Sequence, residues 1–324
     1  MKKKILDNST FPMLDKARFL MISGNAATLQ KSYEDAILIS EQAEQILSKI
    51  NTLEAKEDLF FLLVNNLMDF YNTKGNLKKA EEAGKKAELL LPHITSPSFL
   101  TLYHFMHSLL FLNKGDYDSA LSSVETAIQK CSTAEFPEHF HIFAKIIKAE
   151  ILARSGQLEM ALKLIDHNFK EFKKYYPNES NFKLLRMNAI RSYIYLKQGK
   201  LEKSFSLISD TIQGFDVLFK KPNENPLQGF SHIILGEIYE KQGELLKALE
   251  EYKKAEDVYT HIFKTIEVDD ISYLYKNLAI LGEKMKDDFL SKHYLELLIN
   301  HFGFDHVRTI ESLQHLDKYK LSVL

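Results

Sequence analysis

Two stretches of the chain, KGDYDSALSSVETAIQKC (residues 114–131) and QGELLKALEEYKKAEDVY (residues 242–259), follow one pattern. In each, a glycine is the second residue, and an alanine stands five positions after that glycine. Aligning the whole chain on this pattern gives five copies, whose glycines are separated by 40, 41, 43 and 44 residues. These glycines are Gly75, Gly115, Gly156, Gly199 and Gly243. The shared register predicts a repeat protein.

Residues at fixed distances from each glycine are alike in size. Seven positions before it, four of the five residues are small: Met68, Ser108, Ala149, Ser192 and Gly236. Four positions before it they are large: Tyr71, Phe111, Leu152, Tyr195 and Tyr239. Five positions after it they are small again: Ala80, Ala120, Ala161, Ser204 and Ala248. The size pattern around each glycine predicts a helical hairpin. Glycine can end a helix in the left-handed conformation at little energetic cost, and small residues let two helices approach closely.

Two weaker copies extend the array at both ends. Lys31 and Lys286 take the glycine position, and Ala36 and Ser291 take the small position. One hairpin cannot bury its own apolar face, so several must stack. We therefore predict an all-α solenoid of about seven hairpins that forms a single domain over residues 1–324, with a C-terminal capping helix. The expected hairpins are residues 11–50, 54–92, 97–132, 137–174, 181–219, 226–264 and 269–302, and the expected cap is 305–320.

The composition narrows the class of protein. The chain has 324 residues, of which 45% are apolar, enough to bury a substantial core. Charged residues make up 27% with a formal net charge of −2, which does not favour nucleic acid or an anionic membrane as partner. The single Cys131 fits a reducing compartment, and the start MKKKILDNSTFPMLDK does not predict a signal peptide. No run approaches the roughly 18 apolar residues of a membrane span, so we expect a cytoplasmic protein.

The sequence contains no motif of an enzyme or a metal site. There is no phosphate-binding glycine loop, no nucleophile elbow and no dinucleotide fingerprint. His104 and His107 are three residues apart, but no other ligand pattern accompanies them, so we expect packed or solvated histidines. Cys131 is expected to be a buried structural thiol. Asp287 and Asp288 are expected to cap a helix. We expect no catalytic residue, no cofactor and no metal.

One copy carries the residues of a known family. The stretch LGEIYEKQGELLKALEEYKKA (residues 235–255) resembles the tetratricopeptide repeat family at Leu235, Gly236, Tyr239, Gly243, Ala248, Tyr252 and Ala255. The other copies depart from it: His107, Lys148 and Arg191 stand at the position of Leu235. The period also exceeds the family's usual length of about 34 residues. Long-period variants are similar, among them bacterial peptide-pheromone receptors, the sensor region of some large transcription activators, and kinesin light chains.

The resemblance implies a right-handed superhelix whose concave groove, lined by the first helix of each hairpin, binds a peptide or a partner protein. It places groove-facing side chains 10, 6, 3 and 2 residues before each glycine. The expected site, to which Arg186 is added as a carboxylate ligand, is Asn65, Asp69, Asn72, Phe105, Leu109, Asn113, Glu150, Arg154, Arg186, Tyr193, Lys197, Glu237 and Lys276. Asparagine can hold a peptide backbone, and arginine can bind a carboxylate bidentately. Alternatively, these residues are solvated, or pair within one helix as Glu150 and Arg154 can.

Two functions follow from this pattern. The first is a non-enzymatic scaffold or adaptor that binds a peptide or protein in the groove. The alternative is a cytosolic signalling regulator switched by a small peptide. Such a regulator is expected to lack its own DNA-binding domain, because the first hairpin begins near Phe11 and leaves no room for an N-terminal helix-turn-helix. An exposed terminal repeat also allows a homodimer.

Overall fold

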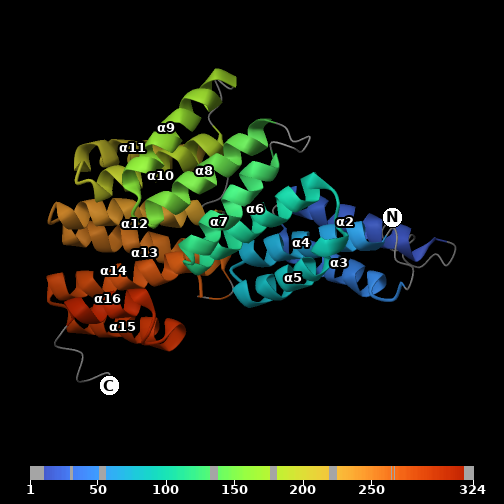
Figure 1. Ribbon diagram of the computed structural model, residues 1–324. Helices are drawn as coiled ribbons and strands as arrows, with labels where there is room; N and C mark the ends of the chain where they lie inside the picture. The colour runs from blue at the N-terminus through green and yellow to red at the C-terminus, as the bar shows by residue number, and fades with distance from the viewer. Residues whose placement is uncertain are drawn as a thin grey trace. The chain divides into compact units, whose positions relative to one another are not determined.

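The regular structure of the protein is helical throughout the residues described. This computed structural model describes residues 11–29, 32–50, 56–131, 138–175, 181–218, 225–263, 265 and 267–316 (Figure 1). The first helices of the repeats are α2 (Met13–Leu29), α4 (Lys56–Thr73), α6 (Pro97–Lys114), α8 (Glu138–Arg154), α10 (Phe182–Lys197), α12 (Pro226–Lys241) and α14 (Asp269–Met285). The second helices are α3 (Tyr33–Leu47), α5 (Leu77–Leu90), α7 (Tyr117–Cys131), α9 (Leu158–Tyr175), α11 (Leu201–Leu218), α13 (Leu245–Ile262) and α15 (Asp288–Phe302). A 3₁₀ turn, η1 (Leu91–His93), follows α5, and α16 (Val307–His315) follows α15. The predicted all-α class is confirmed.

The turn between the two helices of a repeat has the same geometry along the chain. All five aligned glycines have a positive φ, from 71° at Gly75 to 85° at Gly156. Lys286, placed at the glycine position by alignment alone, is left-handed too, with φ 58°. The amide after the turn donates back into the first helix, as from Gln157 to the Leu152 carbonyl at 2.8 Å. These are the bonds of a helix that ends on a left-handed residue, so the predicted helix stop is confirmed.

Small residues bring the paired helices together, as the pattern predicts. The Ser192 and Ser204 hydroxyls lie 2.9 Å apart, and both serines are fully buried. A Cβ added at Gly236 would lie 2.5 Å from the ring of Tyr252. Six pairs of helices pack along each other among the described residues: α2 with α3, α4 with α5, α8 with α9, α10 with α11, α12 with α13, and α14 with α15. The turn and the small residues therefore act together to form the hairpin.

The contacts divide the chain into two compact units. The first unit is Met1–Phe111 with Asp118–Phe136, and the second is Leu112–Tyr117 with Pro137–Leu324. A core cluster of the first unit joins α4, α5, η1 and α6, with Phe61 and Tyr103 among its buried residues. A core cluster of the second joins α10, α11 and α12, with Phe215 and Phe230 among its buried residues. The single-domain organisation stays a prediction.

The ends of several helices are capped by side chains. The Asp287 side chain accepts from the Leu290 amide at 3.0 Å, which confirms the cap predicted there. Asn225 and Gln228 form a capping box at the start of α12. At the C-terminal end, α16 packs against α14 and α15 within the range expected for a cap, and residues 317–324 lie outside those described. None of the described helices has the length and apolar character needed to cross a bilayer.

Candidate functional site

One spacing rule connects the first helices of the second unit. A side chain six residues before one turn contacts a side chain thirteen residues before the next turn. Glu150 of α8 thus accepts from Arg186 Nε of α10 at 2.7 Å. Glu237 of α12 accepts from the Tyr273 hydroxyl of α14 in the same way. Tyr193 obeys the rule as well, because its ring lies 5.5 Å from its counterpart on α12. The repeat therefore lines up polar and aromatic side chains along successive first helices.

Arg154 makes the longest connection in this row. Its side chain is 9% exposed, donates to Glu150 Oε1 at 3.0 Å and lies over the Phe230 ring at 4.2 Å. It also donates to Asp270 of α14, 116 residues further along the chain. Burial disfavours the charge of Arg154, but Asp270 and Glu150 hold its pKa well above the ordinary value. Burial likewise opposes ionisation of Glu150, yet Arg186 and Arg154 lower its pKa. Both charges are thus fixed by their partners.

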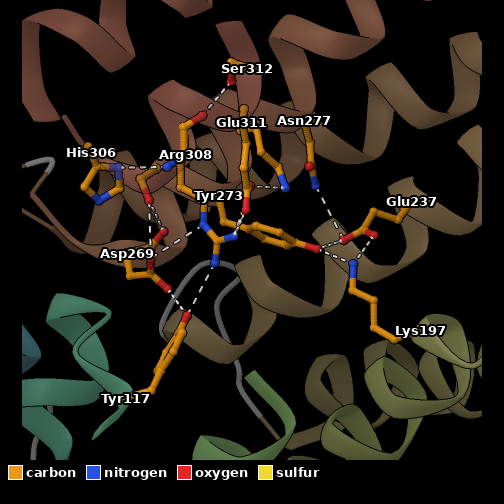
Figure 2. A network of polar contacts seen from close by, with 12 residues as sticks. Tyr117, Lys197, Glu237, Asp269, Tyr273, Asn277, His306, Arg308, Glu311 and Ser312 are labelled. Atoms are coloured by element: carbon orange, nitrogen blue, oxygen red, sulfur yellow. Dashed lines mark hydrogen bonds and ion pairs between the residues drawn. The ribbon is translucent and has the colours of Figure 1, made fainter. Parts of the chain in front are cut away.

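Glu237 is the centre of a second group of contacts. Lys197 Nζ donates to Glu237 Oε2 at 2.7 Å and to the Tyr273 hydroxyl at 2.5 Å. Asn277 Nδ2 lies 3.5 Å from Glu237 Oε1. Figure 2 shows the lysine, the tyrosine and the asparagine converging on this carboxylate from α10 and α14. Burial opposes the charge of Lys197, but Glu237 raises its pKa above the ordinary value. The group therefore consists of one anion, Glu237, and the three side chains that donate to it.

The contacts continue onto α16 (Figure 2). Arg308 donates to Glu311 at 3.3 Å, and Lys276 Nζ donates to the same carboxylate at 3.1 Å. The Tyr117 hydroxyl donates to Asp269 Oδ2 at 2.6 Å, and Arg308 Nε lies 3.9 Å from Asp269 Oδ1. Tyr117 of α7 therefore binds a carboxylate of α14. Sequence reasoning missed Asp269 and Arg308, since its positions came from the middle and end of the first helices.

The network is balanced in charge. Its cations are Arg154, Arg186, Lys197, Lys276 and Arg308, and its anions are Glu150, Glu237, Asp269, Asp270 and Glu311. Within the described part of the chain, the buried Nε atoms of Arg154 and Arg308 nevertheless have no hydrogen-bond partner, and neither has Asn188 Oδ1 of α10. A charged ligand must therefore displace an internal partner from one of the ion pairs. The unpaired donors and the unpaired acceptor, by contrast, can bind a ligand without displacing any internal partner.

The remaining predicted residues belong to α4 and α6. In α4, Asn65 and Asn72 are 2% and 4% exposed, and Asp69 between them is partly exposed. Phe105 of α6 is 2% exposed and therefore packs inside rather than lining an open surface. Leu109 and Asn113, expected to follow it in the groove, are both half-buried. Ligand binding by all of these residues stays a prediction.

The histidines and the cysteine act in packing. The His107 ring lies 4.2 Å from the ring of Tyr103, and burial lowers the pKa of His107 to about 4. Within the described ranges no group of three histidine, cysteine or acidic side chains is placed to hold a metal ion. Cys131 is buried, as predicted.

Comparisons with known proteins match this architecture. No protein-family model matches the sequence, and no curated protein sequence does either. A solved structure of a Rap protein complexed with Competence and Sporulation Factor has a TM-score of 0.68 and 10% identity, covering 95% of this chain and 89% of that chain. The structure of NprR in complex with its cognate peptide NprX has a TM-score of 0.66 and 13% identity, and the match covers 94% of this chain and 84% of that chain.

A third similar solved structure contains a tetratricopeptide repeat region. A signal transduction ATPase with numerous domains from Pyrococcus horikoshii, which has a tetratricopeptide repeat sensor, matches with a TM-score of 0.53 and 16% identity. The match covers 96% of this chain but 44% of that one. At such identities the likeness concerns the fold. The chain has the tetratricopeptide-repeat-like fold that its glycine register predicts.

Proposed function

We propose that this protein is a non-enzymatic binding protein that holds a peptide, or a segment of a partner protein, on its first-helix face. By first-helix face we mean the network side chains of α8, α10, α12 and α14. One observation carries the proposal: predicted binding residues from four successive repeats are connected through ion pairs and ring contacts, and Arg154 among them retains a buried donor without an acceptor in the described part of the chain. Buried donors of this kind are normally satisfied by a partner.

The spacing of the helices suits an extended peptide. Packed helices lie about 8–10 Å apart, and an extended chain advances about 3.3 Å per residue. Four successive first helices therefore match an extended segment of about seven to ten residues. The Rap protein and NprR structures were solved with Competence and Sporulation Factor and with the peptide NprX, which supports a peptide as the ligand.

The chemistry of the face favours a ligand that carries a carboxylate. Arg154 and Arg186 present guanidinium groups that can bind a carboxylate bidentately. Their present partners, Glu150 and Asp270, are carboxylates of the same geometry. A ligand carboxylate can therefore replace one of them without leaving a buried cation unpaired, which would be costly.

A peptide-switched signalling regulator is the second candidate, and the contact between Arg154 and Asp270 favours it. This ion pair joins α8 to α14, which are separated by two complete repeats of the chain. A ligand that takes Arg154 from Asp270 would release α14 from α8 and shift the equilibrium between two arrangements of the second unit. Small-angle scattering tests this candidate: a peptide that leaves the dimensions unchanged identifies a static scaffold. We place either activity in the cytoplasm.

Affinity selection tests the proposed function. A random nonapeptide library is passed over the protein, and bound peptides are identified and quantified by mass spectrometry. Lys197→Gln removes a cation of the face, while the matched Lys292→Gln removes one from an ion pair on α15 whose lysine side chain is 53% exposed. We expect the wild type and Lys292→Gln to bind peptides and to release them chemically unchanged. Lys197→Gln should bind the same peptides at least tenfold more weakly. Equal binding by all three would refute the proposal.

A further inference from the structure

The spacing rule of the second unit finds an exception in the first. Glu150 and Glu237 stand six residues before their turns, and each is met by a donor thirteen residues before the next turn. Asp69 of α4 stands at the same position before Gly75, but the residue thirteen before Gly115 is Leu102. Lys197, two residues before its turn, also donates to Glu237 of the next repeat. In the repeat that precedes Asp69, the residue two positions before the turn is Leu29. At both sequence positions that supply a donor in the second unit, the repeats next to Asp69 therefore have leucine.

A second acceptor without a donor lies beside Asp69. Among the residues that the structure describes, none makes a hydrogen bond or ion pair with the Asp69 carboxylate. Asn65, one helical turn earlier on the same face of α4, has its Oδ1 buried without a partner in this described part. The nearby polar group is Tyr33 of α3, whose pKa is raised by burial and then by the charge of Asp69. Among the described residues of the first unit, these two acceptors therefore receive no hydrogen bond.

Such an arrangement is costly unless something else completes it. A carboxylate surrounded by apolar residues loses hydration, and natural proteins rarely leave one unpaired. The same burial raises the pKa of Asp69 to about 6, so the group is still mainly ionised at neutral pH. Asp69 is partly exposed, so a ligand can reach it. A donor that carries a positive charge would satisfy Asp69 and Asn65 together.

We propose that Asp69 and Asn65 form a subsite for an organic cation, an ammonium or guanidinium group. An ammonium group offers three donors and a guanidinium five, so either can bridge the carboxylate and the amide oxygen. The cation is either the side chain of a peptide or a free amine. This subsite belongs to the first unit and is independent of the first-helix face of the second, so each proposal can fail without the other.

Binding of defined probes tests the subsite on the full-length protein. The probes are Nα-acetyl-arginine methylamide, its neutral citrulline analogue and spermidine, and saturation-transfer NMR measures their dissociation constants. We expect both cations to bind the wild type and the citrulline analogue to bind at least tenfold more weakly. Tighter binding of the arginine probe than of spermidine would assign the cation to a peptide, and the reverse would assign it to a free amine.

Two variants complete the test. Asp69→Asn keeps the shape and removes the charge, so it should fold and should weaken both cations at least tenfold. Asp210→Asn changes an exposed residue of α11 and should leave both affinities as they are. If the citrulline analogue binds as well as the arginine probe, if Asp69→Asn binds both cations like the wild type, or if neither cation binds, the proposal is overturned.

Discussion

Removing the charge of Asp69 should stabilise the protein, and the effect should depend on pH. Burial raises the pKa of this carboxyl from 3.8 to about 6. Between these values the native chain holds a proton that the unfolded chain has released, so stability falls as the pH rises through this window. One pKa unit corresponds to about 1.36 kcal/mol, so the ionised carboxylate costs up to about 3 kcal/mol above pH 6. Partial exposure to solvent makes this an upper limit.

Urea unfolding of Asp69→Asn and wild type at pH 8 and pH 4 measures this cost. At pH 8 the variant should unfold with a free energy about 2–3 kcal/mol above that of the wild type. At pH 4 the difference should shrink below about 1 kcal/mol, because Asp69 is then protonated in the native state. Asp210→Asn, on an exposed face, should differ little from wild type at either pH. An equal difference at both pH values, or no gain at pH 8, would show that the native state satisfies the charge of Asp69.

Three further perturbations probe the fold and the network. Arg154→Met leaves buried carboxylates unpaired and should cost about 3–5 kcal/mol in urea unfolding; if adding Asp270→Asn recovers none of this loss, the ion pair is not its cause. Gly243→Ala meets no atom within 4 Å and should cost only about 1 kcal/mol for its left-handed backbone, whereas Gly236→Ala, whose Cβ would lie 2.5 Å from a buried ring, should cost more by the same assay. The pKa of His107 falls to about 4 on burial, so the unfolded chain binds more protons below its ordinary 6.5, and stability falls as the pH falls through this window. His107→Gln should flatten that part of the stability profile, and an unchanged profile would contradict the shift.

The sequence was a good guide to the hairpins because their chemistry is local. The left-handed turn at Lys286 was placed by counting residues, although no glycine stands there, and the structure has φ 58° at this residue. Close packing of Ser192 on Ser204 followed from size alone. Both features depend on residues within about a dozen positions of the turn, and such neighbours are fixed by helix geometry.

The candidate site was less accessible to sequence reasoning because it depends on how the hairpins stack. Counting within one helix could place Arg154, but the Asp270 partner lies 116 residues away and follows from the stacking of the repeats. Phe105 was placed on an open surface by analogy, yet its side chain is buried. Tyr273 was missed because the analogy considered positions near the end of each first helix, whereas the pairing uses one near its beginning.

The pairing between first helices has a consequence for how the chain can change its length. Glu150 and Arg186 are 36 residues apart, as are Glu237 and Tyr273, and each distance is counted from turn to turn. Tyr193 and Phe230 are one residue further apart, in the repeat whose glycines are 44 residues apart. The pairing therefore survives a change of period, and the additional residue is absorbed before the next first helix begins. Insertions in the connections between repeats should therefore leave these contacts unchanged, because the paired positions are fixed relative to the turns and not to the loops.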